Sequence, residues 1–164
     1  MVRRKKEKVI SSYVMPIIFA LSLFPPFAWE DIGVSLTSPL VNRFVYSFFH
    51  ASVWHCLANL FCYYQILHYY LPSWRIILLS YLVAVFVPDF VLTELPTVGM
   101  SAMIYALIGC ITFYVQRKVY YISWVLFYIL IGFFFPNVNA LMHLYAYCVG
   151  SLYSLLTAPL CRTK

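Results

Sequence analysis

The chain has 164 residues, of which 64% are hydrophobic and only 10% are charged. This composition excludes an ordinary soluble globular domain and predicts one compact integral membrane domain over residues 1–164. The net charge of +6 does not indicate a nucleic-acid-binding face, because the basic residues stand at the ends of apolar runs, as topology signals do.

Six apolar stretches in chain order are read as membrane spans. The first follows a basic N-terminus but lacks a small-residue cleavage site, so we expect an uncleaved span rather than a signal peptide. The predicted fold class is an all-α polytopic bundle of six transmembrane helices, over residues 9–28, 48–70, 74–88, 101–116, 119–135 and 138–159.

The charged residues predict an orientation for this bundle. With six spans, every Lys and Arg except Arg43 falls on one side, which the positive-inside rule makes cytoplasmic. Both termini are therefore expected in the cytoplasm, and a site near the opposite ends of the spans is expected to open to the outer side. The lack of additional spans or soluble domains fits a bacterial inner membrane.

Polar residues within the predicted spans are costly and therefore point to function. No Asp, Glu, Lys or Arg lies well inside a span, and no HExxH motif is present. These absences argue against a carboxylate-based transporter, a two-aspartate protease and a zinc protease. The polar residues that remain include His55 and Asn59 in the second span, Ser101 at the start of the fourth, and His143 in the sixth.

The fourth predicted span is short, since a 16-residue helix is about 24 Å long and a bilayer core is about 30 Å thick. If its inner end lies at the membrane surface, Ser101 begins below the outer surface, level with His143, His55 and Asn59. A serine and a histidine that meet there form a dyad for acyl transfer, with Ser101 as nucleophile and His143 as general base. The Ser101 N–H, Asn59 and His55 are the candidate oxyanion donors.

Five further residues are expected to support these groups. Gly99 allows the backbone to turn closely before the serine, and Tyr105 is expected to pack on the imidazole of His143. Ala146 and Gly150 form a stripe of small residues that allows the sixth span to approach the fourth at Gly109.

Each of these residues also has a simpler interpretation. A serine at a helix start is most often an N-cap, whose hydroxyl accepts a hydrogen bond from a backbone N–H. A single histidine on an apolar helix is most often an interhelical hydrogen-bond donor. The functional hypothesis therefore depends on the whole set of residues and not on any one of them.

Three motifs occur together in the order of the chain. They are His50 and His55 followed by Asn59, then Gly99-Met100-Ser101 followed by Tyr105, and finally His143 followed by Ala146 and Gly150. With this set, the chain resembles the rhomboid family of intramembrane serine proteases over essentially its whole length.

The resemblance implies an intramembrane serine endopeptidase that cleaves transmembrane segments of single-pass or other membrane proteins, within a lipid bilayer and without a metal or cofactor. It assigns Ser101 as nucleophile and His143 as general base. His55, Asn59 and the Ser101 backbone form the implied oxyanion hole, and His50 is implied to be a structural hydrogen-bonding residue.

The chain departs from the family pattern at three places. Ala102 follows the nucleophile where many members have glycine, Ala146 also replaces a usual glycine, and Asn42-Arg43 stands for a Trp-Arg pair. No catalytic group is removed by these changes. Two alternatives remain at this stage: an inactive rhomboid-like protein that binds membrane clients, and a small channel or transporter.

Overall fold

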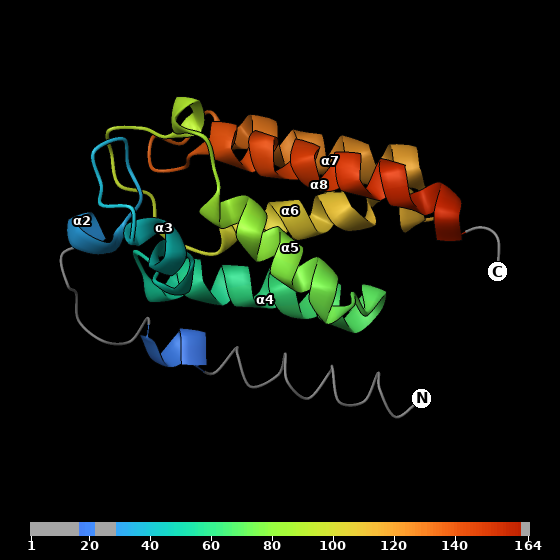
Figure 1. Ribbon diagram of the computed structural model, residues 1–164, viewed down its shortest axis with the longest axis horizontal. Coiled ribbons are helices and arrows are strands. Elements are labelled where there is room, and N and C mark those ends of the chain that lie inside the picture. Colours follow the sequence, from blue (N-terminus) through green and yellow to red (C-terminus); the bar gives the residue numbers. More distant parts are fainter. Residues whose placement is uncertain (1–16, 22–28, 162–164) are drawn as a thin grey trace.

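The computed structural model describes residues 17–21 and 29–161. These residues form helices joined by loops, and their one β-type pairing is an isolated antiparallel bridge between Val34 and Thr97 (Figure 1). Residues 17–21 are helical. The named elements are α2 (Trp29–Ile32), α3 (Asn42–Val45), η1 (Tyr46–Phe48), α4 (Val53–Tyr70), α5 (Trp74–Val85), η2 (Asp89–Val91), α6 (Ser101–Ile111), η3 (Thr112–Tyr114), α7 (Lys118–Gly132) and α8 (Ala140–Cys161).

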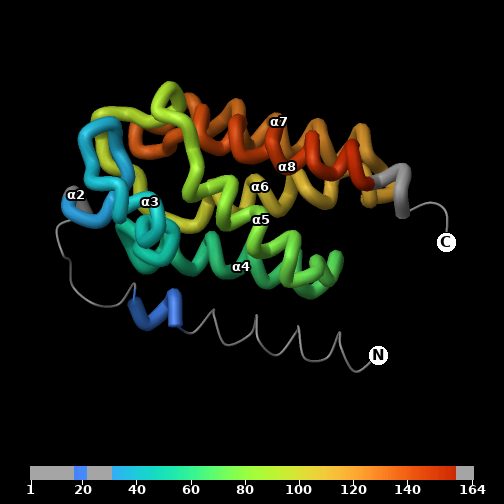
Figure 2. Tube along the Cα trace, in the orientation of Figure 1, coloured from blue at the N-terminus to red at the C-terminus, as the bar shows by residue number. Residues whose placement is uncertain are grey.

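The five longer helices alternate in direction along the chain (Figure 2). As a result α4, α6 and α8 all begin at the end of the bundle where the loops around α2, α3 and η2 gather, as the chain trace shows (Figure 2). The first residues of these three helices are therefore neighbours in space, although they are far apart in the sequence.

Helix α6 occupies the middle of the bundle (Figure 1). It makes its most extensive contact with α8 and also packs against α5 and α4. Most of its side chains are buried, among them Ala102, Met103, Ile104 and Leu107. A helix that is apolar on all sides is stable only when it is surrounded, so the composition of α6 accounts for its central position.

Glycine brings α6 and α8 unusually close together. A Cβ atom at Gly150 would lie 2.1 Å from the carbonyl oxygen of Ala106, and one at Gly109 would lie 2.4 Å from that of Tyr147. Ala146, one turn before Gly150, is also buried. The stripe of small residues thus sits at the contact with α6, where it allows the two backbones to touch.

The loop before α6 is held by residues near the start of the described chain. Asn42 donates hydrogen bonds to the carbonyl oxygens of Asp31 and Gly33. The guanidinium of Arg43 binds Asp89 and the carbonyl of Val87. These contacts fasten residues 31–43 onto the segment that leads from α5 to α6.

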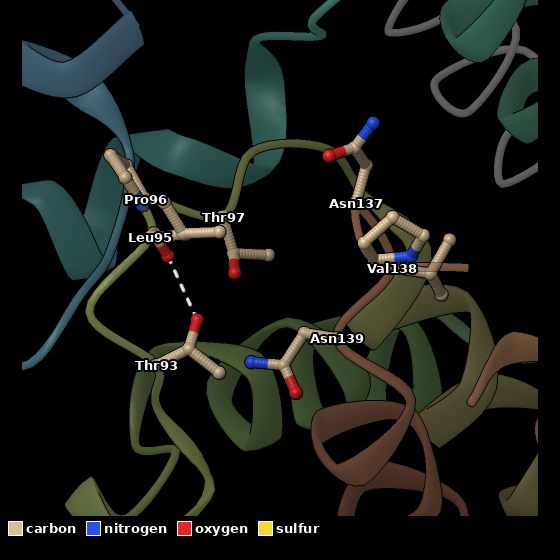
Figure 3. A pocket seen from close by; sticks show the side chains of 8 residues that line it. Thr93, Leu95, Pro96, Thr97, Asn137, Val138 and Asn139 are labelled. Atoms are coloured by element: carbon tan, nitrogen blue, oxygen red, sulfur yellow. Dashed lines mark hydrogen bonds between the residues drawn. The ribbon is translucent and has the colours of Figure 1, made fainter. Parts of the chain in front are cut away.

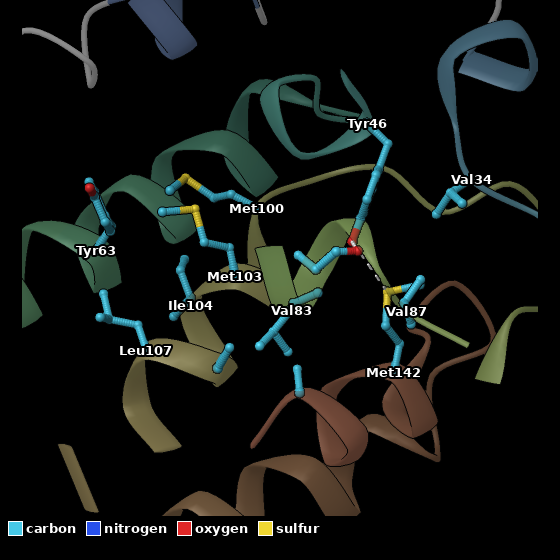
Figure 4. Packing of buried hydrophobic residues seen from close by; sticks show 14 of the residues in the cluster. Val34, Tyr46, Tyr63, Val83, Val87, Met100, Met103, Ile104, Leu107 and Met142 are labelled. Atoms are coloured by element: carbon cyan, nitrogen blue, oxygen red, sulfur yellow. Dashed lines mark hydrogen bonds between the residues drawn. The ribbon is translucent and has the colours of Figure 1, made fainter. Parts of the chain in front are cut away.

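Tyr46 connects the same region to the buried core. Its hydroxyl donates to the carbonyl of Ala84 at 3.0 Å and lies 3.9 Å from the sulfur of Met142, and Figure 4 shows the side chain among the buried residues Val83, Val87 and Met142. Tyr46 therefore links the first loop, α5 and the start of α8.

The predicted membrane spans are the main correction to the sequence analysis. Within residues 17–21 and 29–161, no helix is both long and apolar enough to cross a membrane. Helices α5, α6 and α7 have 12, 11 and 15 residues, fewer than the roughly 20 that a bilayer core requires. The 18 residues of α4 include four tyrosines as well as His55, Asn59 and Gln65, and these side chains lower its hydropathy.

The chain is thus all-helical as predicted in its described part, but the six-span membrane bundle is wrong. The same finding contradicts the membrane and transmembrane assignments and the expected location in a bacterial inner membrane, with cytoplasmic termini and a site open to the outer side.

The boundaries of the predicted spans also differ from those of the helices. The span predicted over 48–70 begins too early, because η1 ends at Phe48 and Ser52 caps α4. The span predicted over 101–116 is too long, because α6 ends at Ile111 and the chain continues as the 3₁₀ helix η3. The span predicted over 9–28 lies outside the described residues except at 17–21.

Candidate active site

Ser101 and His143 meet at the shared starting end of α6 and α8. The Nε2 atom of His143 lies 2.8 Å from the hydroxyl oxygen of Ser101. Ser101 is the first residue of α6 and Met100 occupies the N-cap position, so the serine is not the N-cap of its helix. Its hydroxyl interacts with an imidazole instead, which is the arrangement that an activated nucleophile requires.

Tyr105 fixes the plane of this imidazole. It lies one turn after Ser101 on α6, and its ring stacks on that of His143 with centroids 4.5 Å apart and planes inclined by 22°. Stacked contacts of this kind restrict ring rotation as well as contributing packing energy. The tyrosine therefore holds Nε2 in the direction of Ser101.

Gly99 makes the turn that presents Ser101. Its φ of 111° lies in a region that residues with a side chain rarely adopt. The N–H of Gly99 donates to the carbonyl of Tyr46 at 3.0 Å, and the next N–H, of Met100, donates to Nε2 of His50 at 3.4 Å. His50 thus contacts the backbone of the turn that leads to Ser101.

His55 and Asn59 cover the same turn from α4. A Cβ atom at Gly99 would lie 2.8 Å from Cε1 of His55 and 3.4 Å from Nδ2 of Asn59, so both side chains pack where glycine leaves room. Asn59 is 8% exposed, and its Nδ2 is a buried donor with no hydrogen-bond partner. A buried donor left unpaired costs about 1–3 kcal/mol, which makes this amide a candidate oxyanion ligand.

The electrostatics of the site keep its histidines neutral near pH 7. Burial, together with the nearby His55, lowers the pKa of His143 from the usual 6.5 to about 4. The same two causes lower the pKa of His50 to about 4, and burial lowers the pKa of His55. Neutral His143 can accept a proton at Nε2, and neutral His55 still carries one N–H donor.

Three helices begin in this region, and the N–H groups of His55 and His143 are already paired there, with the hydroxyl of Ser52 and the carbonyl of Asn139. Ser101 is the first residue of α6, and His55 and His143 lie in the first turns of α4 and α8. The N–H groups of a first turn have no intrahelical acceptor and carry the positive end of the helix dipole. The site is therefore arranged to stabilise a negative charge that forms beside Ser101.

A cavity of about 650 Å³ gives access to these groups. Ser101, His143, His55 and Asn59 all line it, and the remaining walls are mainly apolar and aromatic side chains of α4, α6 and α7. A second cavity, of about 200 Å³, lies between residues 93–97 and the loop 136–139 (Figure 3). The two cavities share Thr97 and residues 137–139, so they adjoin close to the catalytic candidates.

Comparison with known proteins found no matching family model, no matching curated protein and no matching solved structure. The resemblance to rhomboid proteases therefore stays a prediction that rests on the motifs and their geometry.

The described part of the chain contains no cluster of side chains suited to bind a metal ion. No group of three or more His, Cys, Asp or Glu side chains in residues 17–21 and 29–161 is placed to hold a metal ion. The predicted absence of a metal and of a cofactor remains a prediction.

Two residues at the site were not singled out from the sequence. Tyr46 supplies the carbonyl that receives the Gly99 N–H, and no local pattern indicates this contact. Asn139 precedes α8 and accepts a hydrogen bond from the N–H of Met142. An asparagine directly before an apolar helix is a recognised start signal, so the position of Asn139 was open to prediction.

Proposed function

We propose that this protein is a serine endopeptidase that uses Ser101 and His143 as a catalytic dyad. The observation that carries the proposal is the 2.8 Å contact between Nε2 of His143 and the hydroxyl oxygen of Ser101, in a cavity that also contains an unpaired donor. The same two residues are those that the resemblance to rhomboid proteases assigns to catalysis.

The first half of the reaction forms an acyl-enzyme. Nε2 of His143 takes the hydroxyl proton while the Ser101 oxygen attacks the carbonyl carbon of a peptide bond. The imidazolium then gives this proton to the leaving amine, and the C–N bond breaks. In the second half His143 deprotonates a water molecule, which attacks the ester, and the proton returns to Ser101.

The oxyanion of each tetrahedral intermediate lies beside Ser101 in this proposal. Its ligands are the Ser101 N–H, the Asn59 amide and an N–H of His55. The intermediate also explains how a base of low pKa can work, because the negative charge that forms next to it stabilises the imidazolium. Burial is unfavourable for an isolated charge, but it strengthens the attraction between two opposite charges that lie close together.

The proposed substrate is an apolar segment of another protein, of the kind that forms transmembrane helices. The support for this class is the lining of the large cavity, which offers apolar and aromatic side chains from three helices. A regular helix hides its scissile carbonyl in hydrogen bonds, so segments with glycine or proline are expected to be cut best.

The test uses the purified full chain and a reporter protein with one apolar helical segment. Wild type, Ser101→Ala and His143→Ala are compared by gel analysis and by mass spectrometry of the products. We expect wild type to cut within the apolar segment and both variants to be at least about 10³-fold slower.

Two results would count against the proposal. Equal cleavage by all three proteins excludes the dyad and indicates a contaminating protease. Stable binding of the reporter by wild type and both variants, with no cleavage by any of them, favours the alternative of a client-binding protein.

A further inference from the structure

Asn139, the residue before α8, makes three hydrogen bonds at the start of that helix. Its Oδ1 accepts from the N–H of Met142 at 3.0 Å, and its Nδ2 donates to the carbonyl of Val91 at 3.0 Å. Its own carbonyl accepts from the N–H of His143 at 3.2 Å. The two side-chain partners fix the orientation of the amide, because only oxygen can accept and only nitrogen can donate.

The bond to Met142 is an N-cap, which Asp, Ser or Thr provides about as well as Asn. Ser52 caps α4 in this way, with its hydroxyl accepting from the N–H of His55. Capping alone therefore does not require an amide at position 139.

The bond to Val91 is what the amide adds. It crosses from α8 to η2, a segment 48 residues earlier in the chain. That segment is itself held in place, because Arg43 binds Asp89 and the carbonyl of Val87. Asn139 therefore ties the first turn of α8 to an anchored part of the structure.

We propose that Asn139 is a positioning residue, whose bond to Val91 sets the distance between Nε2 of His143 and the hydroxyl of Ser101. This inference rests on the proposed function, since it assigns a role within the same dyad. His143 lies one turn after Asn139, and its backbone N–H donates to the carbonyl of Asn139. A misplacement of about 1 Å in a reacting group can cost roughly 100-fold in rate, so a small shift of this turn is enough to matter.

The location of Asn139 makes the tether important when a substrate binds. Asn139 lines both cavities, and Figure 3 shows its side chain on the wall of the smaller one. A peptide that enters either cavity pushes against the turn that carries His143. The bond to Val91 resists that displacement.

The experiment separates the tether from the cap by substitution at one position. Asn139→Asp and Asn139→Ser keep a capping oxygen but lose the amide donor, whereas Asn139→Ala loses both. Each purified full-length variant is labelled with a fluorophosphonate probe over a range of concentrations. This gives the maximal labelling rate and, separately, the concentration that gives half of it.

Ser154→Ala is the matched control on the same helix. The Ser154 hydroxyl accepts a hydrogen bond from the N–H of Phe113 at 3.1 Å, three turns beyond His143. Its removal costs one side-chain-to-backbone bond of α8 without touching the site.

We expect Asn139→Asp and Asn139→Ser to lower the maximal labelling rate at least tenfold, with the half-saturating concentration within twofold of wild type. Ser154→Ala is expected to label within twofold of wild type in both quantities. This should hold even if its melting temperature falls as far as those of the Asn139 variants. If the Asp and Ser variants label at the wild-type rate and only Asn139→Ala is impaired, Asn139 acts as a helix cap alone. That result overturns the proposal.

Hydrogen–deuterium exchange of residues 140–143 gives a second readout that does not depend on Ser101 as a nucleophile. Faster exchange there in the Asp and Ser variants, but not in Ser154→Ala, is the expected result. If wild type labels no faster than Ser101→Ala, the proposed function fails while exchange still decides whether the tether exists. Unchanged exchange in all variants overturns the tether itself.

Discussion

The two sides of α6 are built in opposite ways. On one side its backbone touches that of α8, at a separation so small that a Cβ atom at Gly150 would overlap the carbonyl of Ala106. On the other side a cavity of about 650 Å³ separates α6 from parts of α4 and α7. One face is closed by backbone contact, and the other is open to a ligand.

Ser101 stands at the boundary between these faces. His143, the partner proposed for its catalytic dyad, comes from the closed side, where α8 cannot move without disturbing α6. The candidate oxyanion ligands His55 and Asn59 come from α4 and line the open side. The comparison teaches that the two residues proposed for proton transfer are held by a tight helix contact, while the proposed oxyanion ligands line the cavity.

The strongest test of the open side is Asn59→Leu, which removes the candidate oxyanion ligand. Loss of one such donor is expected to lower kcat by about 10²–10³-fold. The stability of the protein should stay the same or rise, because the substitution also removes a buried donor that has no partner. Reporter cleavage and urea unfolding measure the two effects separately.

The control for this variant is Leu57→Ala on the same helix. Leu57 is exposed and is not among the residues that line the cavity, so cleavage should stay within twofold of wild type. A large loss of stability in Asn59→Leu would contradict the assignment, because it would show that the amide serves the fold.

The closed side is tested by Gly150→Val. The new side chain has no space against the carbonyl of Ala106, so α8 must shift and the free energy of unfolding should fall by roughly 3 kcal/mol. Activity should fall as well, because the shift carries His143 away from Ser101. Denaturant unfolding and probe labelling are the measurements.

Leu152→Val is the matched control, since it places the same residue on an exposed part of α8. We expect it to change stability by only a few tenths of a kcal/mol, as a β-branched residue in a helix does. Equal effects of the two substitutions would show that the α6–α8 contact is not tight.

A smaller effect is expected from pH. His143 has a pKa of about 4 in the folded protein and about 6.5 when unfolded, so the unfolded state binds more protons between these values. Stability should therefore be full above pH 6.5 and should decrease as the pH falls towards 4. The acid limb of kcat/KM should lie near pH 4, provided that circular dichroism shows a folded protein there. An acid limb near pH 6.5, the ordinary pKa of histidine, would contradict this, because it would mean that the imidazole of His143 is exposed to water.

The sequence allowed much of the candidate site to be predicted, for a local reason. His55, Ser101 and His143 all lie in the first turns of their helices, and polar residues at the start of an apolar run show where a helix begins. Because α4, α6 and α8 run in the same direction, groups at their starts come together. This juxtaposition follows from the number and order of the helices and does not need the bilayer depth that was also used to predict it.

The membrane prediction failed because hydropathy counts apolar residues without showing where a helix ends. Residues 112–114 continue the apolar run of α6 but form η3, and Phe48 belongs to a separate short helix. The helices are consequently shorter than the runs, and none in the described chain reaches the length and apolarity of a span.

The tertiary contacts of the site were beyond local patterns. The bond between Asn139 and Val91 and that between Gly99 and Tyr46 join segments about 50 residues apart. Each of these bonds depends on how two loops fold against the bundle. The sequence pattern of neither segment predicts the contact.

The measurement that tests the account most directly is fluorophosphonate labelling of the full chain, followed by mass spectrometry of the modified peptide. The account predicts that wild type is labelled at Ser101, that Ser101→Ala is not labelled, and that His143→Ala labels at least about 10³-fold more slowly. Labelling of Ser101 at the same rate in wild type and His143→Ala would contradict the dyad, because the contact between these two residues would then do nothing to activate the serine.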